Sequence, residues 1–340
     1  MEEKRPEILS IDSLKIGYAS GKSRKLLIPA IYGSAYKGEL IAVLGRNGIG
    51  KSTLLRTITG LQPSLGGNIF IDGRDIKEYS RLQLAKNIGY ISTETVKMAS
   101  MRVSDLVALG RFPHTNWYGK IDDLSHNIII DSIEKTGMSD FYYRFISELS
   151  DGERQRAMIA RALAQDADLM VMDEPTAFLD IRSKYEIIHL LISLTRSRGK
   201  TVIFSTHDFQ MALDQADKIW LLLDNELIEG APEDLFLKGS FDHLFDSSLV
   251  SFDPKNGNYI LQKSEKGQIF VDGEGIIKQW TEKAVCRAGY ILSDRKIHPY
   301  VKVPVEKGKN WILYCENSVN ECESLYNLIC FLITREKNLI

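Results

Sequence analysis

Residues 39–60, ELIAVLGRNGIGKSTLLRTITG, carry the spacing best suited to holding a phosphate chain. Gly45 is followed, after four residues, by Gly50, Lys51 and Ser52, which is the pattern of a phosphate-binding loop. Glycines let successive N–H groups face one phosphate chain. Lys51 adds a positive charge at the β- and γ-oxygens, and the Ser52 hydroxyl is a ligand for Mg²⁺. The stretch therefore predicts a nucleotide-phosphate site.

Two later stretches place acid–base side chains directly after apolar runs. In DADLMVMDEP the run Leu169–Met172 is followed by Asp173 and Glu174, and TVIFSTHD reaches His207. With Leu40–Leu44, these runs predict buried strands whose carboxyl ends meet at the ligand edge of an open sheet. We expect Asp173 to bind Mg²⁺ and Glu174 to polarise the attacking water. Without the phosphate loop, an Asp-Glu cap and a structural His would be the simpler interpretations.

The stretch ELSDGERQRAMIARALA, residues 148–164, predicts a helix with an anion site at its start. Ser150 and Glu153 have the spacing of a capping box, and Gly152 stands where the helix begins. A helix N-terminus preceded by small residues attracts anions. Upstream, Tyr18 in LKIGYASGKS is a candidate for stacking on adenine, although a Tyr in this setting is more often turn or core packing. The Asn-Lys-x-Asp stretch of guanine-binding enzymes is absent.

Taken in order, Tyr18, GRNGIGKST, LSDGERQR, LMVMDEP, FLD and STHD resemble the nucleotide-binding domain of ABC-transporter ATPases over residues 8 to about 240. The resemblance implies an α/β P-loop NTPase fold of ABC type, with ATP and Mg²⁺ as cofactors. It implies catalytic roles for Lys51, Glu174 and His207, and metal contacts from Ser52, Asp173 and Thr93. The nucleotide contacts that it implies are Tyr18, Gly45, Asn47, Gly48, Gly50, Lys51, Ser52, Thr53, Thr93, Ser150, Gly152 and Asp180.

The resemblance also implies a homodimer, because the chain has one phosphate loop and one LSDGERQR signature. In the family the signature binds the γ-phosphate of ATP that is held by the other protomer. Ser150 and Gly152 would then close the partner's site in a head-to-tail dimer around two ATP molecules. Asp180 would link the two sites, and His207 would contact the γ-phosphate.

Two positions depart from the family pattern. Asp151 stands where the signature usually has Gly; if that backbone needs a positive φ, Asp is among the tolerated residues. Thr93, followed by Glu94, stands where the family has a Gln that touches Mg²⁺ and water. Adjacent residues of an extended segment point to opposite sides, so we predict that Thr93 faces the metal and Glu94 the membrane subunit. The alternative is that the Glu94 carboxylate has replaced the Gln.

The expected helical subdomain, about residues 95–150, bears on what is transported. Its VSDLVALGRFPHTNWYG resembles ATPases of bacterial importers of iron chelates, haem and cobalamin, chiefly at Gly110-Arg111-x-Pro113-His114; an ordinary helix ended by Pro113 is the alternative. An importer implies integral-membrane permease subunits, a substrate-binding protein, and a cytoplasmic location on the inner face of the cell membrane. A soluble ABC ATPase, for example in iron–sulfur cluster assembly, is the second hypothesis. A non-hydrolysing binding module is disfavoured by the intact Lys51, Asp173, Glu174 and His207.

Composition excludes several other classes. The net charge of −2 over 340 residues predicts no bulk attraction to nucleic acid or anionic lipid, so no nucleic-acid partner is expected. The longest apolar run, Leu328–Ile333, is far shorter than the roughly 18 residues that span a bilayer. The charged start MEEKRPEILS does not resemble a signal peptide. The four Cys, between Cys286 and Cys330, are expected to be reduced thiols.

From residue 241 to 340 the pattern predicts a separate α+β domain after the nucleotide-binding domain of residues 1–240. Short strands are expected in GNYILQ, GQIFVDG, HPYVKVPVEK and NWILYCE, and helices over 275–289 and 319–337. The stretch resembles no family that we identify from its residues. It is interpreted as a regulatory or dimer-stabilising domain, with an inert extension as the alternative. A metal site at Cys315, Cys322 and Cys330 lacks the usual short Cys spacing.

Overall fold

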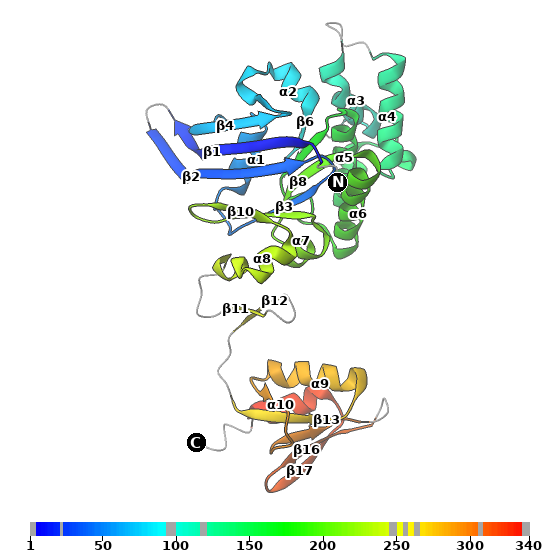
Figure 1. The fold of residues 1–340 in the computed structure, drawn as a ribbon. Coiled ribbons are helices and arrows are strands. Elements are labelled where there is room, and N and C mark those ends of the chain that lie inside the picture. Colours follow the sequence, from blue (N-terminus) through cyan, green and yellow to red (C-terminus); the bar gives the residue numbers. More distant parts are fainter. Residues whose placement is uncertain are drawn as a thin grey trace. The chain divides into compact units, whose positions relative to one another are not determined.

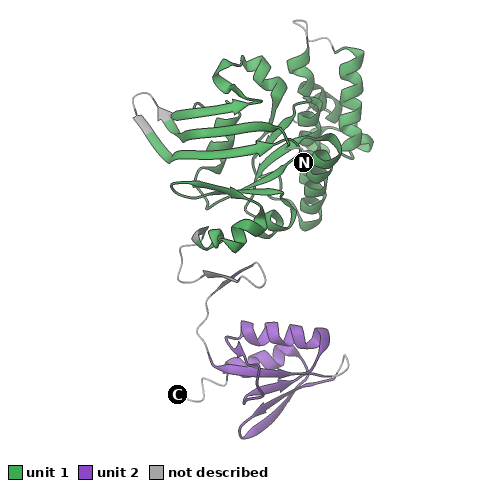
Figure 2. Cartoon of the chain, in the orientation of Figure 1, with its two compact units in different colours: residues 1–246, 252–258 green, residues 247–251, 259–340 purple. Residues whose placement is uncertain are grey.

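The computed structural model describes residues 5–20, 23–92, 100–115, 121–244, 250–253, 258–261, 266–304 and 309–334. The chain divides into two compact units, Met1–Asp246 with Phe252–Asn258, and Ser247–Ser251 with Tyr259–Ile340 (Figure 2). Each unit has a hydrophobic core of its own.

A largely parallel sheet forms the centre of the first unit (Figure 1). Its order is β10 (Leu227–Gly230), β9 (Lys218–Leu222), β3 (Leu40–Leu44), β8 (Thr201–Ser205), β7 (Leu169–Met172) and β6 (Ile88–Ile91). Only β10 runs antiparallel to its neighbour. The strands predicted at Leu40–Leu44 and Leu169–Met172 are confirmed, and all their residues are buried. Strands covered on both faces need apolar side chains on both, which explains the unbroken apolar runs.

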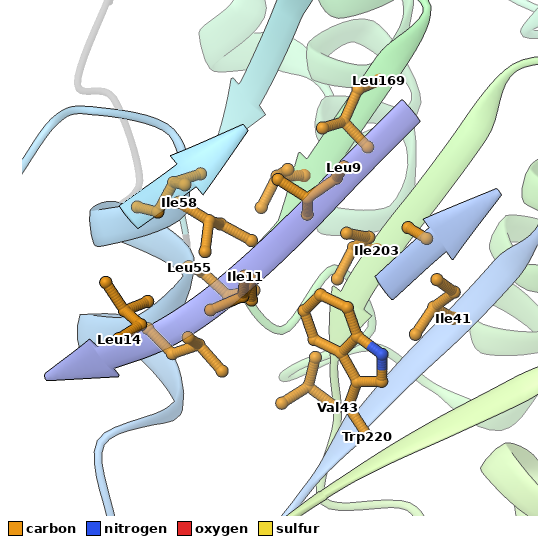
Figure 3. Packing of buried hydrophobic residues seen from close by; sticks show 14 of the residues in the cluster. Leu9, Ile11, Leu14, Ile41, Val43, Leu55, Ile58, Leu169, Ile203 and Trp220 are labelled. Carbon is orange, nitrogen blue, oxygen red and sulfur yellow. The ribbon is translucent and has the colours of Figure 1, made fainter. Parts of the chain in front are cut away.

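An antiparallel sheet completes this unit. Its order is β2 (Ser23–Tyr36), β1 (Glu7–Ser20), β4 (Gly66–Ile71) and β5 (Arg74–Asp75). Leu9, Ile11 and Leu14 of β1 share one buried cluster with α1 (Lys51–Ile58) and with the parallel strands, where Trp220 is the largest member (Figure 3). The phosphate loop and its helix are therefore held by apolar packing against both sheets.

The remaining helices of the first unit lie beside these sheets, with α3, α4, α5 and α6 grouped on one side (Figure 1). The α-helices are α2 (Arg81–Asn87), α3 (Val103–Ala108), α4 (Asp123–Lys135), α5 (Asp151–Ala164), α6 (Ile181–Arg198), α7 (Phe209–Gln215) and α8 (Pro232–Leu237). The 3₁₀ turns are η1 (Ile76–Glu78), η2 (Leu109–His114), η3 (Ser139–Phe141), η4 (Ile146–Glu148) and η5 (Ser240–Leu244). Helices α3 and α4 pack on α5, so the helical insert is mounted on the signature helix.

The Gly-Arg-x-Pro-His pattern explains how the insert is attached. A Cβ added at Gly110 would lie 2.1 Å from the Arg161 carbonyl oxygen, so only glycine lets η2 approach α5 this closely. Arg111 is buried and donates to the Ala164 carbonyl at 2.9 Å. His114 Nε2 lies 3.0 Å from the Gln165 carbonyl oxygen. In this structure these residues have a packing role, and the pattern does not by itself identify a cargo.

The second unit is a small α+β domain. Its sheet has the order β14 (Ile291–Leu292), β13 (Gln268–Asp272), β15 (Tyr300–Lys302), β16 (Trp311–Cys315) and β17 (Ser318–Cys322). Helices α9 (Gly275–Arg287) and α10 (Leu325–Thr334) contribute Val285 and Leu328 to its core. A further pair, β11 (Val250–Asp253) and β12 (Asn258–Leu261), forms a two-stranded sheet.

One prediction for this unit was wrong. The helix expected over 319–337 begins only at Leu325, because Ser318–Cys322 pairs antiparallel with Trp311–Cys315 as a hairpin. Cross-strand pairing decides this stretch, and local helical pattern does not. The side chains of Cys315 and Cys322 are buried in the core and form no disulfide with each other.

Candidate functional site

The phosphate loop lies between β3 and α1 and depends on its glycines. Gly48 and Gly50 have φ of 77° and 117°, conformations that L side chains rarely adopt. At Gly45 an added Cβ would lie 2.7 Å from the Leu222 carbonyl oxygen. Asn47 is exposed on the loop and Ser52 on the first turn of α1. The loop therefore takes its shape from positions where only glycine fits.

Lys51 is folded back over this loop. Its Nζ donates to the carbonyl oxygens of Gly45 at 2.8 Å and Arg46 at 3.3 Å, and the residue is only 6% exposed. Burial lowers the pKa of Lys51, and the nearby carboxylates of Glu174 and Asp173 partly oppose that shift. The site thus holds a largely desolvated ammonium beside two carboxylates.

The carboxyl ends of β7 and β8 bring the acidic residues to the same place. Asp173 is 2% exposed, and its Oδ1 accepts a hydrogen bond from Ser205 Oγ at 2.7 Å. The same Ser205 oxygen accepts from the Glu174 N–H at 2.9 Å. Ser205 ends β8, one strand away from β7. Ser205 was not among the predicted site residues. It could have been found from the sequence, because it is the last residue of a strand whose carboxyl end meets the site.

Glu174 and His207 face each other across this edge. Glu174 has a φ of 49°, a conformation that costs a non-glycine residue about 1–3 kcal/mol. Its carboxylate contacts His207 Nε2, and His207 Nδ1 lies 3.5 Å from Lys51 Nζ. Because an ammonium only donates, a hydrogen bond between these two atoms requires Nδ1 to be the acceptor, which leaves Nε2 facing Glu174. Lys51, His207 and Glu174 form one polar chain.

Tyr18 stands over the start of α1. Its hydroxyl lies 3.0 Å from Thr53 Oγ1. Thr53 is buried, whereas Tyr18 is 52% exposed, so the aromatic residue is fixed at one end and accessible on its ring. This arrangement is compatible with stacking on a flat ligand next to the phosphate loop.

The LSDGERQR residues form a second group. Ser150 and Glu153 make the predicted capping box at the start of α5. Asp151 lies in the helix and is not among the residues with positive φ, so the concern about its backbone does not arise. A Cβ at Gly152 would lie 2.8 Å from Ser183 Oγ, which gives this glycine a packing role. Asp180 caps α6 by accepting from Ser183 N at 3.0 Å and Oγ at 2.8 Å.

The two groups are separate within one chain. In the part of the chain that the structure describes, no hydrogen bond or ion pair joins Ser150, Gly152 or Asp180 to the Lys51 group. Thr93 and Glu94 lie outside the described residues, so their assignment to the metal and to the membrane subunit stays a prediction.

Fold and site together define a P-loop nucleotide-binding domain, and comparisons with known proteins identify its class. The profile of the family described as ABC transporter matches residues 30–177, and an AAA-domain profile matches residues 142–213. A profile described as iron ABC transporter C-terminal domain matches residues 266–333, where the sequence had indicated no family. None of the helices in the described part of the chain combines the length and the hydrophobicity of a membrane-spanning segment.

Known relatives agree with this class. MJ0873 of Methanocaldococcus jannaschii, an uncharacterized ABC transporter ATP-binding protein, is 34% identical over 78% of this chain and 91% of its own length. FhuC of Bacillus subtilis, an iron(3+)-hydroxamate import ATP-binding protein, is 32% identical over 77% of this chain and 99% of its own. FepC of Escherichia coli, a ferric enterobactin transport ATP-binding protein, is 33% identical over 64% of this chain and 80% of its own length.

Solved structures share the fold. An inward-facing metal-chelate-type ABC transporter is 28% identical with a TM-score of 0.61, over 70% of this chain and 89% of that one. The dimeric bacterial ABC transporter cassette MJ0796 is 24% identical with a TM-score of 0.58, over 66% of this chain and 99% of that one. The chain belongs to the ATP-binding proteins of ABC transporters, and it is an ATPase of that family that binds ATP.

Proposed function

We propose that this ATPase is the energy-supplying subunit of an importer of ferric chelates, with haem or cobalamin as related cargoes. The observation that carries the ATP-hydrolysing part of the proposal is the gathering of Lys51, Asp173, Glu174 and His207 at one sheet edge. The direction of transport is supported by the importer names of relatives such as FhuC and FepC, and by the iron-transporter profile over residues 266–333. A soluble ABC ATPase is the second candidate; the membrane-importer relatives favour the first.

The residues at this edge divide the chemistry of phosphoryl transfer, which is mainly positioning and electrostatics. Lys51 holds the β- and γ-phosphates, and Glu174 orients and polarises the attacking water. His207 contacts the γ-phosphate and keeps the Glu174 carboxylate in place. The hydroxyl of Ser52 and the carboxylate of Asp173 are oxygen donors of the kind that Mg²⁺ prefers, and Thr93 is the third proposed donor. Bound Mg²⁺ would neutralise charge on the phosphates.

We further propose that two chains act head to tail. Tyr18 stacks on adenine in its own site, and Ser150 and Gly152 close the site of the partner protomer. Exposed apolar side chains next to Asp180 support such a contact: Phe178 is 92% exposed and Ile181 is 76% exposed. Large apolar groups on a monomer surface frequently mark interfaces.

The proposed partners are permease subunits in the membrane and a substrate-binding protein, with this chain on the cytoplasmic face. A cavity of about 590 Å³ lies between the α2 segment and η2–α5. Leu84, Leu109 and Phe112 line it, together with Arg81 and Arg161. Because Leu109 and Phe112 are exposed apolar side chains at this cavity, we propose that it binds a cytoplasmic segment of the permease.

Mixing two inactive variants tests the shared site. Lys51→Ala removes the phosphate-loop cation, and Ser150→Arg blocks the signature. A mixed head-to-tail dimer has one site with both defects and one with neither, so phosphate release should reappear on mixing. No recovery, while cross-linking with ATP shows mixed dimers, would mean either that both sites must act together or that the arrangement is wrong.

Co-purification separates the importer from the soluble alternative. A tagged Glu174→Gln chain, held in the ATP state, should bring down a polytopic membrane protein from detergent-solubilised membranes. A matched Lys51→Ala chain, which loses the phosphate contact, is the control for nucleotide dependence. Recovery of soluble partners alone would favour the second candidate.

A further inference from the structure

The first turn of α5 contains two carboxylates next to the N–H groups that the proposed function assigns to a phosphate. Asp151 and Glu153 both lie in that turn. Free N–H groups at a helix N-terminus attract an anion, whereas an unbalanced carboxylate beside them repels it. For a phosphate to bind there, both carboxylates must be balanced by other groups.

Glu153 is balanced by the capping box. The Ser150 N–H donates to Glu153 Oε2 at 2.8 Å, and the Glu153 N–H donates to Ser150 Oγ at 3.3 Å. The hydrogen bond from Ser150 is the main reason that the pKa of Glu153 is lowered. The carboxylate of Glu153 therefore stays charged as part of the helix cap, and the positive charges of Arg156 and Arg144 also lower its pKa.

Asp151 is balanced by one basic side chain, Arg154. Arg154 Nη1 lies 2.9 Å from Asp151 Oδ1, and Nη2 donates to the Leu149 carbonyl oxygen at 3.0 Å. The guanidinium thus bridges the residue before Ser150 and the residue after it. The next basic residue, Arg156, pairs instead with Glu186 at 2.7 Å.

We propose that Arg154 is a positioning residue for ATP, an inference that rests on the function proposed above. By pairing with Asp151 it neutralises that carboxylate and holds it beside the guanidinium, so that the terminal phosphate of the partner's ATP can approach Ser150 and Gly152. A chain with glycine at position 151 has no charge there and does not need this pair. The Asp151–Arg154 pair is how this signature tolerates an acid at its centre.

The test uses full-length protein in a Glu174→Gln background, so that ATP is bound and not consumed. The ATP concentration for half-maximal dimerisation is measured by analytical ultracentrifugation. Arg154→Met should raise that concentration about three- to tenfold at low ionic strength, as expected for unbalancing one partly exposed charge. The effect should shrink at about 1 M salt, where the screening length is ~3 Å.

The double variant Arg154→Met, Asp151→Asn should need the same ATP concentration for half-maximal dimerisation as Asp151→Asn alone, because position 151 then carries no charge to balance. Arg154→Lys, which keeps the positive charge, should remain close to the parent. If Arg154→Met does not fold, Arg154→Gln, which still carries a donor for Leu149, tests the same charge.

Two results would overturn the role of Arg154 while leaving the proposed function intact. One is that Arg154→Met does not change the ATP concentration for half-maximal dimerisation. The other is that Arg154→Met raises this concentration equally whether position 151 is Asp or Asn. The second would mean that Arg154 acts through the Leu149 carbonyl. If the Glu174→Gln parent itself does not dimerise with ATP, the proposed head-to-tail function fails, and this role fails with it.

Discussion

Gly152 is expected to be required because α6 passes close to it. A Cβ at this position would lie 2.8 Å from Ser183 Oγ and 3.0 Å from Ser183 Cβ, so Gly152→Ala must displace the Ser183 side chain or move α5 and α6 apart. Overpacking of this kind costs about 1–3 kcal/mol. Replacing a helical Gly by Ala returns up to ~1 kcal/mol of helix propensity. The net loss should be about 1 kcal/mol, or roughly 2–4 °C in Tm for a unit of this size.

The assay is a double-mutant cycle with thermal unfolding and ATP hydrolysis as readouts. Ser183→Gly removes both atoms that the new methyl group would meet, so Gly152→Ala should cost less in that background, with a coupling of about 1 kcal/mol. Ser193→Gly is the matched control, because Ser193 lies in the same helix but is exposed. It imposes the same change of residue type without touching the contact.

Two outcomes would refute this reasoning. If Ser183→Gly rescues no better than Ser193→Gly, the contact with α6 is not why position 152 must be small. If stability returns but hydrolysis does not, the small residue serves the approach of the partner's phosphate and not the packing of the helices.

Three further outcomes follow from the site and its surroundings. Glu174→Gln should still bind ATP and dimerise, while phosphate release falls at least about a hundredfold, as expected for losing a general base; near-normal turnover would contradict the role of Glu174. Phe178→Ala should leave Tm unchanged, since the side chain is exposed in the single chain. It should raise the ATP concentration needed for dimerisation about tenfold or more, because a Phe buried in the dimer contributes about 1.5–3 kcal/mol. Unchanged ultracentrifugation profiles would argue against a place for Phe178 in the interface. Asp122 caps α4, and its hydrogen bonds to Ser125 lower its pKa. Because the folded pKa lies below the unfolded value of about 3.9, the stability that the charge provides is present above that pH and is lost as pH falls through the folded pKa. The Tm difference between wild type and Asp122→Asn should therefore be steady above about pH 5 and shrink as pH falls below about 4. A difference that stays constant down to low pH would mean that the charge contributes nothing.

Features formed by residues that are close in the sequence could be predicted from the sequence. The phosphate loop was predictable, because its glycines and Lys51 act within one turn of chain. The Ser150–Glu153 capping box joins residues three apart, and Leu169–Met172 is apolar because both faces of its strand are buried. The family resemblance rested on the same short motifs. The second unit has no such motif, and its family was found only by comparison over residues 266–333.

Tertiary structure decided the contacts that join distant parts of the chain. Ser205 lies 32 residues after Asp173, yet it bridges Asp173 and the Glu174 N–H because β7 and β8 are neighbours in the sheet. The closeness of Gly152 to Ser183 depends on how α5 packs against α6. The strand at Ser318–Cys322 exists because β16 offers it a hydrogen-bonding edge. Each of these contacts joins two separate elements of the chain, so its energy arises only when those elements pack together.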